Sequence, residues 1–396
     1  MVVRRDLASL CVATAFASTA TTMLVLAVPL LALEFGMGAT GVGLIVSSAF
    51  VLPLVLAVPF GRVVDRFGAR AVLIAGFVTF LVALGPAVAT PGLATLVFGY
   101  VVATLGQLAS VVASQALVAD LGQGTGREAA YGWWTTSVAG GQFVGPLVAG
   151  IILDTLTRSM VFVAPMLCIA VAIAMALVVR TRTATSGGAS VPLVRSGNSF
   201  GVLKDRTVMI AILTSSSALW AITVFATYFP VRLAELTVPA TTIGALMSLR
   251  ALASVVIRPF MSPAVRLLGG RERTVVFTLA GLGAGLVALG FADALPAFAM
   301  VCVVLGIATG LSQPVSMVMV ADRVAPRERG TVLGIRLTGN RLAQLVAPIA
   351  LVLVAEAFGL GWMFVAHGVV VLGAAVVLHR LVRGAPPDTA SESAPH

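Results

Sequence analysis

Two arginines lie well inside long apolar stretches of the sequence, and they are the side chains best suited to chemistry. Arg250 lies about halfway along the stretch 240–260, and Arg341 lies near the middle of 330–355. A guanidinium offers several N–H donors and a fixed charge, which suit a carboxylate, phosphate or phenolate. It can equally bond to the carbonyl groups of a neighbouring helix. Both roles stay open. Arg336, nearer the end of its stretch, is expected to extend toward the surface.

Uncharged polar side chains recur within other apolar stretches. Counted along the chain, the first, fourth, seventh and tenth stretches carry clusters of Ser, Thr and Gln, whereas the third, sixth, ninth and twelfth are almost wholly apolar. Because polar groups are costly in hydrocarbon, the first set is expected to line a cavity and the second to face lipid. Individual hydroxyls could instead bond within their own helix. The candidate cavity residues are Gln107, Trp220, Arg250, Gln313, Asn340, Arg341 and Gln344.

The elements that must position these residues follow from composition. The chain has 396 residues, of which 59% are hydrophobic and only 10% are charged, and its mean hydropathy is +1.08. A water-soluble chain needs more polar surface than this, so the expected solvent is lipid. A helix crosses a bilayer with roughly 20 apolar residues. We therefore expect an all-α polytopic membrane protein with twelve spans, at 7–33, 40–60, 71–90, 92–119, 130–153, 159–179, 207–231, 240–260, 274–292, 296–320, 330–355 and 361–379.

Basic residues are distributed unevenly among the connections between these spans. The formal net charge is +10, and 20 of the 25 basic residues fall at the chain ends and in every second connection. Only Arg158 and Arg232 fall in the other connections, and the remaining three lie within spans. Basic residues favour the cytoplasmic side, so both termini are expected in the cytoplasm and the protein in the cell membrane. The charge indicates orientation and not nucleic-acid binding.

The chain divides into two related halves. Residues 181–206 break the apolar pattern with Ser, Gly, Thr and Pro, and are expected to form a cytoplasmic linker. Polar, Gly and Pro residues repeat at a constant offset of 202, as in Gln142 and Gln344 or Pro146 and Pro348. The expected domains are a six-helix bundle at 1–180, a second one at 207–383, and a disordered cytoplasmic tail at 384–396. Such repeats are typical of secondary transporters.

A short motif follows the second span: Gly61, Asp65, Arg66, Gly68 and Arg70 in the segment GRVVDRFGAR. Its glycines permit a tight reversal, and Asp65 could cap a helix start. The segment resembles the signature between helices two and three of the major facilitator superfamily. This resemblance implies the two-bundle fold and a cytoplasmic latch between the halves, in which the distal arginine pairs with an acid that matches Asp120. The alternative is a basic loop that only sets topology.

The fifth span contains a second motif, with Gly141, Gly145, Pro146 and Gly150 in the segment GQFVGPLVAG. It resembles the antiporter signature of drug and metabolite exporters in the same superfamily. This implies a kinked hinge between the halves and a bias toward export. The alternative is ordinary packing of small residues. The arginine usual in helix four of proton-linked exporters is missing, since Val101 and Val102 occupy that neighbourhood.

Other functional classes lack support in the sequence. There is no HExxH, nucleophile elbow or Gly-rich nucleotide loop, and no His is paired with carboxylates at ligand spacing, so we expect no enzyme, metal or cofactor. A channel suits the repeat less well, and a sensor or a lipid flippase is a minor alternative. The expected function is export of small organic molecules by a monomeric secondary transporter, in exchange for protons. The second candidate is an importer or facilitator of a small organic anion.

Overall fold

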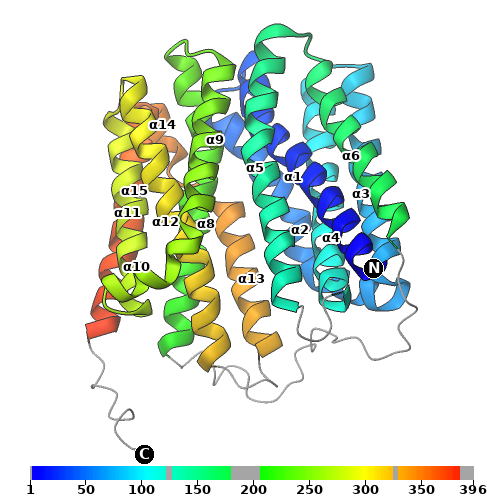
Figure 1. The fold of residues 1–396 in the computed structure, drawn as a ribbon. Helices are drawn as coiled ribbons and strands as arrows, with labels where there is room; N and C mark the ends of the chain where they lie inside the picture. Colours follow the sequence, from blue (N-terminus) through cyan, green and yellow to red (C-terminus); the bar gives the residue numbers. More distant parts are fainter. Residues whose placement is uncertain (1, 122–126, 180–205, 324–328, 384–396) are drawn as a thin grey trace, which may run out of the picture.

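The structure, a computed structural model, describes residues 2–121, 127–179, 206–323 and 329–383, and these ranges contain helices but no strand (Figure 1). The first half comprises α1 (Val2–Glu34), α2 (Ala39–Phe67), α3 (Ala69–Ala89), α4 (Leu93–Leu121), α5 (Arg127–Thr155) and α6 (Met160–Val178). The second half comprises α8 (Arg206–Glu235), α9 (Ala240–Val256), the 3-10 helix η1 (Arg258–Phe260), α10 (Met261–Leu267), α11 (Arg271–Phe291), α12 (Leu295–Arg323), α13 (Arg329–Val346), α14 (Val352–Phe358) and α15 (Leu360–Arg383). The all-α prediction is confirmed.

Eleven helices within the described ranges are long and apolar enough to cross a membrane, and they coincide with eleven of the twelve expected spans. The remaining span, expected at 330–355, is divided between α13 and α14 by turns at residues 347–351. Pro348 lacks the N–H that a helix needs, and Leu351 is in the left-handed region with φ 58°. The expectation of one continuous helix there is therefore wrong.

The helices form two bundles with the same internal packing. In the first bundle α3 packs on α4 and α6, while α1 packs on α5 and α6; in the second, α11 packs on α12 and α15, while α8 packs on α13 and α15. The two six-helix bundles of the prediction are thus confirmed, and α13 takes the place that α5 has in the first. Of the expected linker and tail, residues 181–205 and 384–396 lie outside the described residues, and Arg206 already belongs to α8.

Glycines let neighbouring helices of one bundle approach backbone to backbone. A Cβ added at Gly106 on α4 would lie 2.5 Å from the carbonyl oxygen of Gly76 and 2.8 Å from the amide nitrogen of Phe80, both on α3. A Cβ at Gly283 on α11 would lie 2.9 Å from the carbonyl oxygen of Gly368 on α15. Lipid tails are as apolar as the helices themselves, so this close packing is a main source of helix association.

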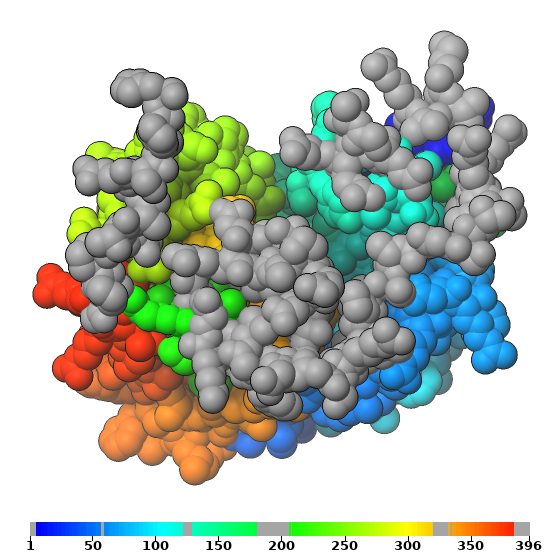
Figure 2. All heavy atoms as spheres, turned by 90° about the horizontal axis from the view of Figure 1, so that it is seen from below, coloured from blue at the N-terminus to red at the C-terminus, as the bar shows by residue number. Residues whose placement is uncertain are grey.

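The two ends of the molecule differ in charge. The end that we call the basic end carries both ends of the described chain, Val2 and Arg383, and the connections that follow α2 and α10. Figure 2 shows the molecule from this end, with the colours of the first half mostly on one side and those of the second half on the other. Its exposed arginines include Arg62, Arg66, Arg266, Arg271, Arg380 and Arg383. The opposite end, called the distal end, carries the connections that follow α1, α5 and α8.

Hydrogen bonds between the two bundles lie between mid-helix and the distal end, as far as the described residues show. Asp154, near the end of α5, accepts hydrogen bonds from the backbone N–H groups of Ala240 (3.0 Å) and Thr241 (2.7 Å) at the start of α9. It thus caps a helix of the other bundle. The further bonds join Thr40 to Glu356, Tyr228 to the carbonyl oxygen of Ala39, and Ser248 to that of Phe143.

Substitution of Gly106 tests the packing of α3 on α4. We expect Gly106→Ala to lower the unfolding temperature of the purified protein, because the new methyl group meets backbone atoms that cannot move without separating the helices. Overpacking of this kind costs about 1–3 kcal/mol. Gly85→Ala is the control, since no atom lies within 4 Å of the added carbon there. Equal unfolding temperatures for the two variants would contradict this account.

Candidate functional site

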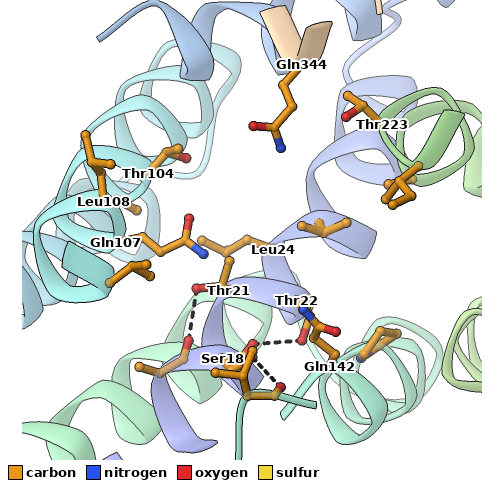
Figure 3. Close-up of a pocket in the computed structure, with 18 of the residues that line it drawn as sticks. Ser18, Thr21, Thr22, Leu24, Thr104, Gln107, Leu108, Gln142, Thr223 and Gln344 are labelled. Carbon is orange, nitrogen blue, oxygen red and sulfur yellow. Dashed lines mark hydrogen bonds between the residues drawn. The ribbon is translucent and has the colours of Figure 1, made fainter. Parts of the chain in front are cut away.

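A cavity of about 520 Å³ lies between the two bundles, and both contribute to its wall. The first bundle supplies residues mainly from α1, α4 and α5, and the second supplies them from α8, α9, α12 and α13. Figure 3 shows the side chains of Gln107 and Gln344, one from each bundle, pointing into this space. The cavity has the size of a site for a small organic molecule.

The first bundle presents a neutral wall. Its polar residues are Thr14, Ser18, Thr21, Thr22, Tyr100, Thr104, Gln107, Ser110, Ser114, Trp134 and Gln142. Several hydroxyls bond within their own helix, as Thr21 does to the carbonyl oxygen of Ala17 at 2.9 Å. Ser18 instead donates to Val138 on α5, at 2.8 Å. The hydroxyls therefore both line the cavity and hold α1 to α5, and the amides of Gln107 and Gln142 make no hydrogen bond with any described residue.

The second bundle presents a cationic wall. Arg250 on α9, Arg258 in η1 and Arg341 on α13 line the cavity, together with Gln313 and Gln344. The Arg250 guanidinium carbon lies 5.5 Å from the centre of the Phe225 ring. Arg341 donates to the Oε1 atom of Gln344 at 3.1 Å. Among the described lining residues there is no Asp, Glu or His, so these charges have no counter-ion in the wall.

Five of the seven candidate cavity residues lie in the cavity wall, and Trp220 and Asn340 do not. The Trp220 indole N–H donates to Nδ1 of His367 on α15, at 3.0 Å. Asn340 is buried and accepts a hydrogen bond from Ser215 at 2.7 Å. Both side chains are turned toward neighbouring helices of the second bundle. The sequence indicates which helices carry polar residues but not which face of each helix meets the cavity.

Arg336 is buried and does not extend to the surface, so that expectation is wrong. Its guanidinium donates to Oε1 of Gln313 at 3.0 Å and to the hydroxyl of Ser316 at 3.2 Å. The same amide oxygen also accepts a hydrogen bond from Ser215, at 3.4 Å. Gln313 therefore uses its polar atoms within the bundle, although it forms part of the cavity wall.

The motif at 61–70 lies at the basic end. Gly68 has φ 83° and joins α2 to α3, as the reversal requires. The prediction that Asp65 caps a helix start is wrong: α2 continues past it to Phe67, and Gly68 occupies the N-cap of α3 without a side-chain cap. Arg70 donates to the carbonyl oxygen of Leu177 on α6 at 2.6 Å, and no ion pair joins it to Asp120, which is also among the described residues.

The motif at 141–150 places α5 between the two bundles. A Cβ at Gly141 would lie 2.5 Å from the carbonyl oxygen of Ala15, and one at Gly145 would lie 2.6 Å from that of Thr19, so both face α1. Gly150 and Pro146 face α9: a Cβ at Gly150 would lie 2.9 Å from the Cα of Thr241, and the Pro146 carbonyl abuts Gly244. One helix thus touches its own bundle on one side and the other bundle on the other.

Sequence reasoning missed several residues of the wall. Arg258 follows Arg250 by eight residues and Ser254 by four, which places all three on one side of the α9–η1 segment. That spacing is visible in the sequence and could have indicated a shared face. Gln142 repeats Gln344 at the offset of the two halves, which was a second usable signal. Aromatic residues such as Phe77 and Phe80 carry no comparable signal in so apolar a chain.

Comparison with known families settles the class of the protein. The family described as Major Facilitator Superfamily matches residues 10–237 and, again, residues 212–396. The chain belongs to the major facilitator superfamily. It is therefore a membrane-spanning transporter of this superfamily. None of the curated proteins compared with the chain matches it significantly.

Solved structures of superfamily transporters share the fold. A bacterial homologue of the human lysosomal transporter Spinster, in an inward-facing and unoccupied conformation, has a TM-score of 0.78 at 13% identity, over 96% of both chains. The nucleoside transporter NupG has a TM-score of 0.77 at 12% identity, and the match covers 97% of this chain and 100% of NupG. A POT family transporter in complex with a thioalcohol-conjugated peptide has a TM-score of 0.80 at 12% identity, and the match covers 95% of this chain and 96% of the transporter. At these identities the likeness concerns the fold alone.

Arg336, a buried arginine outside the cavity wall, offers a test of the hydrogen bonds that hold Gln313 in place in that wall. We expect Arg336→Ala to lower the unfolding temperature, because the Ser316 hydroxyl loses its donor and the Gln313 oxygen keeps only the long bond from Ser215. Unsatisfied buried groups cost roughly 1–3 kcal/mol each. Arg380→Ala, at an exposed position on α15, is the matched control and should unfold like the wild type. A wild-type unfolding temperature for Arg336→Ala would show that its hydrogen bonds contribute nothing.

Proposed function

We propose that this transporter exports small organic molecules across the cell membrane by alternating access, in exchange for protons. The observation that carries the proposal is a cavity walled by both bundles, while the hydrogen bonds between the bundles among the described residues lie from mid-helix to the distal end. A carrier of this kind binds its substrate near the bilayer midplane and rocks one bundle against the other. Such a cavity would be loaded from one side and emptied to the other.

The orientation of the protein in the membrane follows from the distribution of its basic residues. Arginines crowd the basic end, and the positive-inside rule assigns that end to the cytoplasm. Both termini would then be cytoplasmic, and the conformation described here would be closed toward the outside. A single chain encloses the cavity, which suits a monomer.

The two motifs receive roles in this cycle. In this structure Arg70 bonds within its own bundle, to the carbonyl oxygen of Leu177. We propose that Asp65 and Arg70, with Asp120 of the same bundle, form the first bundle's side of a latch that engages the second bundle only when the basic end closes. In the second motif, the glycines hold α5 against α1 while Pro146 and Gly150 meet α9, which makes α5 the element on which the bundles turn. The resemblance of this motif to the antiporter signature supports export.

The cavity wall sets a condition on proton exchange. Its described residues include no carboxylate and no imidazole, so a proton carried by the protein would have to bind outside this wall.

An importer or facilitator of a small organic anion is the second candidate function. The observation in its favour is the set of three arginines without counter-ions. It shares the alternating-access mechanism with the exporter and differs in direction and coupling. Uptake measured in vesicles, with pH and potential gradients imposed separately, distinguishes the two.

Export predicts a growth phenotype. Expression in a pump-deficient cell should raise tolerance to at least one toxic amphiphile, and Gly145→Val should abolish that tolerance because the side chain would collide with Thr19 and Thr22 on α1. Gly140→Val on the same helix is the control, since no atom lies within 4 Å of its added carbon. Export would be refuted if wild type, Gly145→Val and Gly140→Val confer the same tolerance.

The distal contacts predict a gate at Asp154. In a chain with Cys11, Cys168 and Cys302 replaced by Ala, Val25→Cys places one thiol in the cavity wall. Asp154→Ala should increase its labelling by an impermeant reagent added outside about five-fold, because loss of a helix cap costs about 1 kcal/mol. Asp154→Asn, which keeps one of the two acceptor oxygens, should give a rate between those of the wild type and Asp154→Ala. Identical rates for the wild type and Asp154→Ala would mean that the cap does not hold this end closed.

A further inference from the structure

We propose that the transported molecule is an organic anion with an aromatic or aliphatic body, and that its charged group binds Arg250 and Arg341. This inference rests on the proposed function in placing the substrate in the cavity between the bundles. It adds the chemical class of the substrate and the orientation in which it binds.

The first observation is a basic stripe along one helix. Arg250, Ser254 and Arg258 all line the cavity and are spaced four residues apart. At 1.5 Å per residue, the two arginines stand about 12 Å apart along the axis, one deep and one at the basic end. Arg258 is exposed and Arg250 is partly buried. An anion that approaches from the basic end therefore meets positive charge at the mouth and again at depth.

The second observation is that Arg250 lacks a partner of opposite charge. No described carboxylate lies within ion-pair distance, and its Nε atom is buried without a hydrogen-bond partner. Its guanidinium lies over the face of the Phe225 ring. A guanidinium in a low-dielectric site is stabilised most by an anion that accepts its N–H groups in pairs.

Arg336, which is buried within the same bundle, shows what a structural role looks like in this protein. It donates to Gln313 and Ser316 within the second bundle. Arg250 makes no comparable bond to a described residue, and Arg341 bonds only to Gln344, another residue of the cavity wall. Their donors are thus left to the cavity.

The wall formed by the first bundle suits the uncharged part of the ligand. The first bundle contributes no charge there, but it presents the aromatic rings of Phe50, Phe77, Phe80, Tyr100 and Trp134. Gln107 and Gln142 add amides that can bond to neutral polar groups. The anionic group would thus face the second bundle and the apolar body the first, so that the ligand contacts both.

The charge of the ligand has a consequence for export. A cell interior negative to the outside drives an anion outward, whereas a cation leaves against the potential. An anion can therefore be exported without a carboxylate in the cavity to carry protons. This agrees with the composition of the described wall.

Binding of two ligands of one shape tests the proposal directly. The purified full-length protein in detergent is titrated by calorimetry with 1-naphthoate and with 1-naphthamide, which differ in charge at neutral pH. We expect the wild type to bind naphthoate at least about ten-fold more tightly, as is typical for a charge-assisted pair. Arg250→Gln and Arg341→Gln should each lower naphthoate affinity about ten-fold and leave naphthamide affinity unchanged. Arg250→Lys, which keeps the positive charge, should lose less naphthoate affinity than Arg250→Gln.

Arg380→Gln is the control, since it removes an exposed arginine on α15 that does not line the cavity, and it should keep the preference for the anion. A cooperative thermal transition confirms that each variant is folded. The proposal would be overturned if the wild type bound both ligands with equal affinity, or bound no naphthoate at millimolar concentration. It would also be overturned if the glutamine variants lost affinity for both ligands equally. If vesicle export fails while the binding preference holds, the proposed function falls and the anion site stands.

Discussion

Every polar group of this protein within the membrane must find a partner in the protein or face water, because hydrocarbon offers none. This constraint explains why the described chain is helical throughout and why its hydroxyls bond to carbonyl oxygens one turn back, as those of Thr14, Thr19 and Thr104 do. It also gives meaning to the exceptions. A guanidinium that donates to neighbouring helices is structural, and one that donates to no described residue is available to a ligand. Arg336, which donates to Gln313 and Ser316, and Arg250 stand on opposite sides of that distinction, although the Nε atom of each is buried without a hydrogen-bond partner.

The same solvent changes what holds the helices together. Burial of apolar surface gives little advantage between helices in lipid, so contact depends on shape and on a few hydrogen bonds. Glycines provide close backbone contact within a bundle, as at Gly76 and Gly106, and also where α5 meets α9 of the other bundle, as at Gly150 and Gly244. Among the described residues, the hydrogen bonds between the bundles lie from mid-helix to the distal end, with the Asp154 cap among them. A rocking carrier requires a contact of this kind on which each bundle can turn as a unit.

Composition and periodicity were sufficient to predict the fold. They predicted the residues of the candidate site less completely. Long apolar stretches predict spans with small error, since the bilayer fixes their length. The break at residues 347–351 was missed, although Pro348 marked it, because a proline within a membrane helix is often tolerated. The positions of Trp220 and Asn340 were missed for another reason. Which face of a helix turns toward the cavity depends on packing against neighbours, and His367 and Ser215 as their partners are not visible from spacing. Asp65 was misplaced because α2 extends about two turns further than its apolar stretch.

The central claim is that the two bundles move against each other around the shared cavity. Distances between spin labels at two positions per end, in a chain without native cysteines, test it most directly. Phe67 and Leu267 are exposed at the basic end, and Leu156 and Leu295 at the distal end, with one of each pair in either bundle. Between pH values or on addition of 1-naphthoate, we predict that the basic-end distance shortens in the same population in which the distal distance lengthens. Distances that stay fixed at both ends under every condition, or that lengthen together, would contradict the account.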